Sequence, residues 1–192
     1  MPTNQELRRA IRRQGIVEAA ATVFAEQGIQ AATLEQIGAK VGLSKASLYY
    51  YVDSKEALVA EVLKGVLDDI DARAQESCGS EADPLERLRC RAKAHVETAF
   101  LTPAGRLIVA NLDALVSNKA AASLLRHHEE PARKLLQEAK AQGLTGDIDI
   151  TCAVKLLYGA LNNIPRWYEP RSGPLDPVIE RTWALFLGGV RA

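Results

Sequence analysis

The stretch over residues 33–58 constrains the fold of this chain more than any other, because it specifies two short helices joined by a glycine turn. Thr33 stands three residues before Gln36, the spacing of a capping box, in which each side chain bonds the backbone N–H of the other residue. Gly42 follows the last apolar position of that helix and provides the left-handed backbone that ends it. Ser44 is placed to cap a second helix. Two helices joined in this way predict a helix-turn-helix.

The second helix is expected over Lys45–Tyr51. In a helix-turn-helix this helix enters the major groove of DNA with its N-terminal residues. Small residues there let the backbone approach the duplex, a lysine suits phosphate, and tyrosines carry hydroxyl groups on rigid side chains. Asp53 and Glu56 form a second capping-box pattern, so the next helix is expected to begin at about Lys55. The alternative is an ordinary helical hairpin whose tyrosines are half-buried.

A gapless set of residues in this chain resembles the N-terminal signature of the TetR family of transcriptional regulators. The set is Thr33, Ile37, Gly38-Ala39, Gly42, Ser44, Leu48-Tyr49, Ser54-Lys55 and Leu58. Two positions depart from that signature, since Val52 stands where Phe is usual and Tyr50-Tyr51 stand where His or Tyr is usual. The resemblance implies binding to double-stranded operator DNA, with Lys55 at a phosphate. The residues expected to contact DNA are Thr33, Ser44, Lys45, Ala46, Ser47, Tyr49, Tyr50 and Lys55.

The composition of the whole chain predicts an all-α protein. Its 192 residues, 47% of them hydrophobic and 25% charged, are enough for one large or two small domains. Alanine and leucine are abundant, and β-branched runs bounded by turn dipeptides are missing. A net charge of zero argues against a protein that coats nucleic acid indiscriminately.

The cysteines and the apolar runs indicate where the protein works. Cys78, Cys90 and Cys152 are widely separated and form no C-x-x-C pair, which favours a reducing cytoplasm over a disulfide framework or a structural zinc site. The sequence contains no signal-peptide pattern and no run of about 18 apolar residues. We therefore expect a cytoplasmic protein that does not enter a membrane.

Apolar spacing predicts about nine helices in two domains. The helix expected over residues 55–75 has an apolar stripe too long for a small domain, so it should connect two hydrophobic clusters. This organisation gives a three-helix DNA-binding domain at 1–54 and a larger antiparallel helical domain for ligand binding and dimerisation at 55–192.

Before the first helix, expected over residues 12–27, the segment 1–10 is polar and is predicted to be mobile. Four arginines cluster at this point, and two interpretations stay open. They form either an arm that reaches phosphates or the minor groove, or a solvated basic start to the helix. The four are Arg8, Arg9, Arg12 and Arg13.

The last two helices are the predicted dimer face. Residues from about Asp149 to Ile164 are apolar on more than one side, and Pro165 is expected to end that helix. Residues 177–190 are similarly apolar. One side of each helix would pack inside its own chain and the other against a second copy, with Leu157 and Phe186 placed at the interface or in the core.

The larger domain is expected to enclose an apolar pocket. Its predicted lining is Leu88, Val96, Leu107, Leu112, Leu125 and Leu136. His95 lies on an apolar helical face and is either a ligand contact or a core histidine with satisfied hydrogen bonds. His127-His128, followed by two glutamates, are expected to form a solvated polar patch, because adjacent helical residues point in different directions. Pro131 should kink or split its helix.

A second resemblance lies near the C-terminus. Asn162, Ile164–Tyr168 and Gly173–Leu175 are similar to the corner between the last two helices of TetR-family regulators of fatty-acid and steroid-catabolite degradation. Several of those regulators respond to acyl-coenzyme A thioesters. The resemblance implies an acyl-CoA effector, with Arg166 and Trp167 suited to its phosphate-bearing, adenine-bearing end. The alternative is architectural, with Trp167 and Tyr168 wedged into the corner between the two helices.

Catalytic chemistry has no visible place in the sequence. We find no phosphate-binding glycine loop, no nucleophile–base spacing, no paired carboxylates on an apolar face and no metal-ligand cluster, and we expect no cofactor. The leading hypothesis is a homodimeric repressor that binds a palindromic operator and is released by a small apolar or acyl-CoA-type effector. The alternatives are a helical-bundle enzyme or small-molecule carrier, and an architectural DNA-binding protein.

Overall fold

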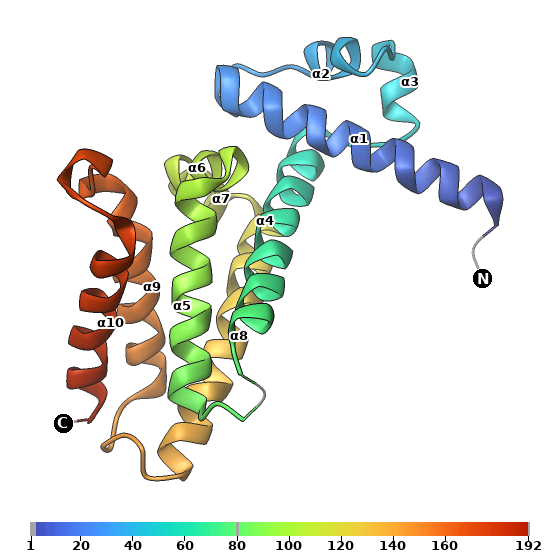
Figure 1. The fold of residues 1–192 in the computed structure, drawn as a ribbon. Coiled ribbons are helices and arrows are strands. Elements are labelled where there is room, and N and C mark those ends of the chain that lie inside the picture. The colour runs from blue at the N-terminus through green and yellow to red at the C-terminus, as the bar shows by residue number, and fades with distance from the viewer. Residues whose placement is uncertain (1–2, 80, 192) are drawn as a thin grey trace. The chain divides into compact units, whose positions relative to one another are not determined.

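The computed structural model describes residues 3–79 and 81–191, and all regular structure in these residues is helical, as expected (Figure 1). Ten α-helices and one 3-10 helix are formed there: α1 Asn4–Gln27, α2 Leu34–Lys40, α3 Lys45–Tyr49, α4 Lys55–Ser77, α5 Pro84–Leu101, α6 Pro103–Ala110, α7 Leu112–Ser117, α8 Lys119–Ala141, α9 Ile150–Trp167, η1 Pro170–Ser172 and α10 Leu175–Arg191. The segment after Thr102 forms two short helices, α6 and α7, which are separated at Asn111.

Two compact units share the chain. The first contains Met1–Val66 and Pro103–Leu124, and the second contains Leu67–Thr102 and Leu125–Ala192. The helices α4 and α8 therefore contribute residues to both units. The division into domains at residues 54 and 55 stays a prediction.

The helix-turn-helix forms in the first unit through the local bonds that the sequence specifies. Gln36 N donates to Thr33 Oγ1 at 3.3 Å, and Thr33 N donates to Gln36 Oε1 at 2.8 Å, so the capping box at the start of α2 is confirmed. Ser47 N donates to Ser44 Oγ at 3.1 Å and starts α3. Gly42, in the turn, has φ +67°, a conformation that glycine adopts at little cost.

Gly38 fixes how closely α2 approaches the turn. Its carbonyl accepts from Leu43 N at 2.9 Å, and a Cβ at this position would lie 2.7 Å from the Leu43 carbonyl oxygen. Since real Cβ atoms do not come this close to backbone oxygen, the turn requires glycine here.

Two expectations about helix starts are wrong. Helix α1 begins at Asn4, not near Arg12, because Thr3 and Glu6 form a further capping box, with Thr3 N donating to Glu6 Oε2 at 2.6 Å. The four arginines therefore lie within α1, and residues 4–10 are helical; Met1 and Pro2 lie outside the described residues. Helix α4 does begin at Lys55, but its cap is Ser54, whose Oγ accepts from Ala57 N at 3.0 Å.

Both prolines that were expected to interrupt helices lie inside them. Helix α8 continues past Pro131, and α9 continues past Pro165 to Trp167. A proline leaves the carbonyl four residues earlier without its helical donor. For Pro131 that residue is His127, which is exposed, so solvent can satisfy the freed carbonyl.

The core of the second unit lies between α5, α8, α9 and α10. Leu88, Leu136, Val154, Leu157 and Ile164 are almost completely buried in it. Trp183 packs in the same core with its ring centroid 5.5 Å from that of Phe186. Buried polar side chains of α5, α8 and α9 lie beside this apolar core and are described below.

Candidate functional site

Helix α3 presents the residues expected at DNA to the surface and buries its apolar residue. Lys45, Ala46 and Ser47 are exposed, Tyr50 is 63% exposed, and Leu48 is completely buried. The alternative of a hairpin with half-buried tyrosines does not fit Tyr50, whereas Tyr49 is 49% exposed.

The polar side chains of this surface already have partners within the first unit. Thr33 Oγ1 and Ser44 Oγ accept the capping bonds described above, and Ser44 Oγ lies 2.9 Å from Ser47 Oγ. Lys45 Nζ lies 2.6 Å from Glu35 Oε1. This hydrogen-bonded ion pair raises the pKa of Lys45 and lowers that of Glu35. Because the pair is exposed, it is weak enough for Lys45 to exchange Glu35 for DNA.

Lys55 holds the α1–α2 loop against the start of α4. Its Nζ donates to the carbonyl oxygens of Ile29, Gln30 and Ala32, at 3.0, 3.1 and 3.1 Å. An ammonium group has three N–H donors, so these bonds use all of them. Contact between Lys55 and a phosphate stays a prediction, and it would require the ammonium group to exchange at least one carbonyl.

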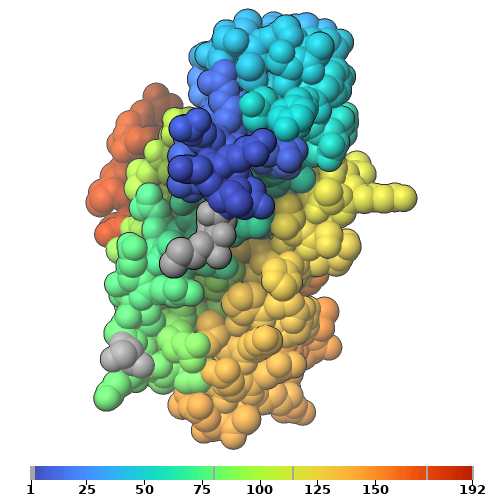
Figure 2. Space-filling model, turned by 90° about the vertical axis from the view of Figure 1, so that its right-hand side faces the viewer, coloured from blue at the N-terminus to red at the C-terminus, as the bar shows by residue number. Residues whose placement is uncertain are grey.

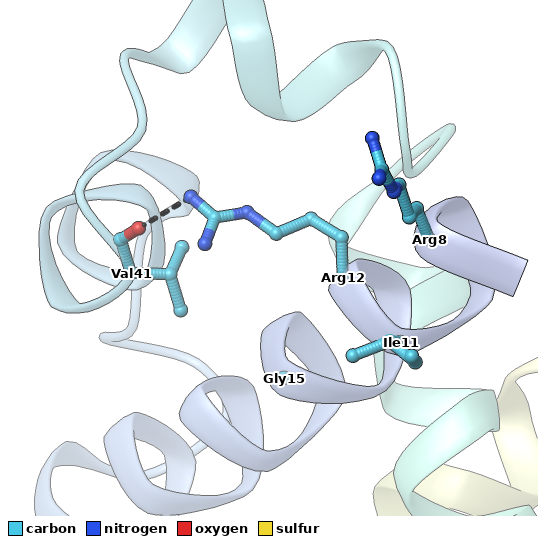
Figure 3. A pocket seen from close by; sticks show the side chains of 5 residues that line it. All are labelled: Arg8, Ile11, Arg12, Gly15 and Val41. Carbon is cyan, nitrogen blue, oxygen red and sulfur yellow. Dashed lines mark hydrogen bonds between the residues drawn. The ribbon is translucent and has the colours of Figure 1, made fainter. Parts of the chain in front are cut away.

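The arginines of α1 contact the helix-turn-helix at two places. Arg12 Nη2 donates to the Val41 carbonyl at 2.8 Å, beside a surface hollow of about 260 Å³ that Arg8 also lines (Figure 3). Arg9 Nη2 donates to the Tyr50 carbonyl at 3.4 Å, and its guanidinium carbon lies 5.0 Å from the centre of the Tyr50 ring. The N-terminal half of α1 thus supports both the turn and the end of α3. The cluster of arginines was visible in the sequence, but these contacts were not.

A polar cluster of six residues lies in the second unit. Arg91, at 6% exposure, donates from Nε to Tyr158 Oη at 3.1 Å, from Nη1 to Asp71 Oδ1 at 2.6 Å, and from Nη2 to the His128 carbonyl at 3.0 Å. Arg91 Nη2 also lies 2.9 Å from His128 Nδ1. His95 completes the cluster, with Nδ1 3.3 Å from His128 Nε2 and Nε2 2.9 Å from Asn162 Oδ1.

The chemistry of arginine fixes the direction of these bonds. A guanidinium can only donate, so His128 Nδ1 must accept and a neutral His128 carries its proton on Nε2. His128 Nε2–H then donates to His95 Nδ1, and His95 Nε2–H donates to Asn162 Oδ1. Burial lowers the pKa of His95 to about 4 and that of His128 to about 2, so both rings are neutral at neutral pH. Burial also raises the pKa of Tyr158.

The residues expected at an effector lie in different surroundings. His95 is buried in the polar cluster, as a histidine with satisfied hydrogen bonds, while Arg166 and Trp167 are exposed at the end of α9. Tyr168 does wedge the following corner, since its hydroxyl donates to the Gly173 carbonyl at 2.6 Å and its ring packs on Phe100. Trp167, at 59% exposure, does not.

The interior was expected to be more apolar than it is. His128 was predicted to lie in a solvated patch and is instead buried, while His127 is exposed. Leu88, Val96 and Leu136 are completely buried. The predicted lining draws on both units, because Leu107 belongs to the first unit.

Among residues 3–79 and 81–191, no group of three His, Cys, Asp or Glu side chains is placed to hold a metal ion. In the same residues, no helix combines the length and the apolar character needed to cross a membrane.

A capped, exposed α3 behind a glycine turn defines the first unit as a helix-turn-helix DNA-binding module of a transcriptional regulator. Residues 16–62 match the bacterial regulatory proteins of the tetR family, and residues 81–190 match the tetracyclin repressor-like C-terminal domain. The chain belongs to the TetR family. It is a transcriptional repressor that binds operator DNA and an effector, and it is not an enzyme.

Relatives match along almost the whole chain. The HTH-type transcriptional repressor KstR2 of Mycobacterium tuberculosis is 31% identical over 186 residues, which cover 93% of this chain and 92% of that protein. The solved structure of the ketosteroid transcriptional regulator KstR2 of Mycobacterium tuberculosis has a TM-score of 0.66 at 30% identity, over 94% and 95% of the two chains. AibR, solved in complex with isovaleryl coenzyme A and operator DNA, shares the fold, with a TM-score of 0.69 at 22% identity over 94% and 98%.

The position of Lys55 generates a prediction that separates support of the fold from contact with DNA. Lys55→Met should lower the free energy of unfolding by about 1–3 kcal/mol, because it leaves three carbonyls without their donor. If Lys55 also binds a phosphate, the slope of log K for operator binding against log salt concentration should fall by about 0.9. Urea unfolding and a salt titration of operator binding measure the two effects.

Lys40→Met is the matched control, because the exposed pair between Lys40 and Glu26 should contribute less than about 1 kcal/mol. A Lys55→Met protein as stable as the wild type would contradict the structural role. A destabilised Lys55→Met protein with the salt slope of the wild type would show that Lys55 does not contact a DNA phosphate.

Proposed function

We propose that this repressor acts as a homodimer, whose two α3 helices bind the half-sites of a near-palindromic operator in the cytoplasm. The observation that carries this proposal is the exposed surface of α3 behind a capped N-terminus. Two-fold symmetry would present the α3 helices to successive major grooves, about 34–36 Å apart. Lys45 and Tyr50 would contact base edges. The residues at or near the DNA sugar–phosphate backbone would be Thr33, Ser44, Ala46, Ser47 and Tyr49.

The proposed dimer interface is the outer face of α9 and α10, the helices expected from the sequence. Leu156 on α9 is 67% exposed and Leu185 on α10 is 80% exposed. Glycine and alanine residues surround them on the same exposed faces: Gly159, Ala160, Ala184, Gly188 and Gly189. Small residues beside large apolar ones let two helices pack closely, and exposed leucines of this kind favour a partner surface. Leu157 belongs instead to the core, where it is 2% exposed.

The interface generates a prediction about oligomeric state. Leu185→Asp should give a folded monomer that no longer protects the full operator, because it would place an unpaired charge in an apolar contact. Leu101→Asp is the matched control, since Leu101 is 66% exposed on α5, outside the proposed interface, and that variant should stay dimeric. Analytical ultracentrifugation and operator footprinting give the results. A stable dimer of Leu185→Asp would contradict the interface.

An acyl-CoA thioester is the effector that we propose. Support comes from the similarity of the α9–α10 corner to acyl-CoA-responsive regulators and from AibR, a protein of the same fold solved with isovaleryl coenzyme A. Arg166 and Trp167 are adjacent and exposed, and they would bind phosphate by charge and adenine by stacking. Both ring nitrogens of His95 are already engaged, so an effector would contact its carbon atoms or replace Asn162.

Release of DNA requires the effector to bind two states of the dimer with different affinity. We propose that the bound state favours a separation of the two α3 helices that no longer matches successive grooves.

An operator gel shift tests the effector. Medium- or long-chain acyl-CoAs should release DNA, while free fatty acids and free CoA should not. Arg166→Ala should need about tenfold more acyl-CoA, the cost of one charge-assisted hydrogen bond. Arg171→Ala is the matched control, because Arg171 is exposed nearby and bonds Glu169. The acyl-CoA proposal fails if no thioester releases DNA, or if the Arg166 variant responds as the wild type does.

A further inference from the structure

A pocket of about 450 Å³ opens on the surface of the second unit, within the volume range of small-molecule sites. Its walls come from the C-terminal part of α4, the first half of α5 and the middle of α8, which lie side by side in Figure 2 as green and orange surfaces. Neither the DNA surface nor the proposed acyl-CoA contacts at Arg166 and Trp167 involve its lining. That lining includes Asp71, Gln75, Arg87, Arg91, Pro131 and Leu135.

Arg91 lines this pocket and is held by several hydrogen bonds. Tyr158 and His128 fix its Nε and Nη2 atoms, and the directed hydrogen bonds through His95 to Asn162 fix His128 in turn. Arg91 Nη1 donates to Oδ1 of Asp71, which also lines the pocket. Arg91 Nη1 is thus the part of the guanidinium whose partner is itself a residue of the pocket lining.

Arg87 adds a second guanidinium one turn earlier on α5. Residues four apart lie on the same helical face, and both arginines line the pocket. The contact of Arg87 with Glu138, at 3.4 Å, is long for a charge-assisted bond, which normally measures about 2.7–2.9 Å. The described lining residues thus include two arginines and one carboxylate, that of Asp71, while Glu138 pairs with Arg87 from outside this lining.

We propose that this pocket binds a small organic anion, whose carboxylate or phosphate group lies between Arg87 and Arg91 in place of Asp71. Both groups match the planar donor edge of a guanidinium. Pro131 and Leu135 of α8 provide an apolar wall for the body of the ligand. The bound anion takes the place of Asp71 at Arg91 Nη1, so binding frees the Asp71 side chain.

Displacement of Asp71 by the anion also affects α4, and any effect on DNA binding through this helix rests on the proposed effector response. Asp71 lies on α4, and the same helix begins at Lys55 in the first unit. Loss of the Asp71–Arg91 ion pair removes a link between α4 and α5. Anion binding itself depends on neither the operator nor acyl-CoA.

Isothermal titration calorimetry on the full-length protein without DNA tests the pocket. The probes are octanoate and octyl phosphate, with octanamide as the neutral analogue of octanoate. At least one of the two anions should bind, and octanamide should not bind. The anion that binds more tightly shows whether the pocket prefers a carboxylate or a phosphate group. Arg87→Gln should weaken anion binding about tenfold, the loss of one charge-assisted bond. Asp71→Asn should strengthen it, because the substitution removes the competing charge.

Arg133→Gln is the matched control, since Arg133 lies on α8 outside the pocket and donates to Thr151 at 3.0 Å. It should bind the anions as the wild type does, and circular dichroism should show all variants folded. The proposal would be overturned if neither anion bound, or if octanamide bound as tightly as the anions. It would also be overturned if the Arg87 and Arg133 substitutions had equal effects, or if Asp71→Asn left the affinity unchanged. The gel shift with acyl-CoA in the same preparations tests the proposed function separately.

Discussion

The buried guanidinium of Arg91 is the interaction on which the second unit depends. Arginine stays protonated in proteins, so a buried arginine is stable only when charged or polar partners replace water. Those partners come from three helices, as Asp71 on α4, His128 on α8 and Tyr158 on α9. These directional bonds add to the apolar core a geometric constraint on how the helices pack. Arg91 and its Nη1 partner Asp71 also line the pocket, which is why support of the fold and the proposed anion site share one residue.

The neutral histidines link this cluster to pH. Their pKa values are lowered by burial to about 4 for His95 and about 2 for His128, against about 6.5 in an unfolded chain. Above pH 6.5 neither state binds the extra protons, and the folded form keeps its full stability. As the pH falls below 6.5 the unfolded chain takes up protons that the folded form excludes, so stability decreases down to the folded pKa values.

On α9, Tyr158, Asn162 and Arg166 are spaced four residues apart, so the polar cluster and the proposed effector contact share one helical stripe.

The first unit could be predicted from the sequence largely because its bonds are local. Thr33 with Gln36, Ser44 with Ser47 and the turn at Gly42 join residues a few positions apart, so their spacing alone identifies them. The same logic applies to Thr3 and Glu6, whose capping box was present in the sequence and was overlooked. The polar cluster could not be found in this way, because Arg91 and Tyr158 are 67 positions apart and His128 stands between an exposed histidine and an acidic pair. Helical periodicity indicates which face is buried, but it does not identify the polar groups that meet there.

Nitrogen NMR of the three histidines tests the directed hydrogen bonds most directly. Imidazole nitrogen shifts distinguish the two neutral tautomers and the charged ring, and the exposed His127 provides an internal reference. Between pH 6 and 8, His95 and His128 should both be neutral and protonated on Nε2. A proton on Nδ1 of His128 would contradict the account, because Arg91 Nη2 could then not donate to that nitrogen. An imidazolium signal from either buried ring at pH 7 would contradict it as well.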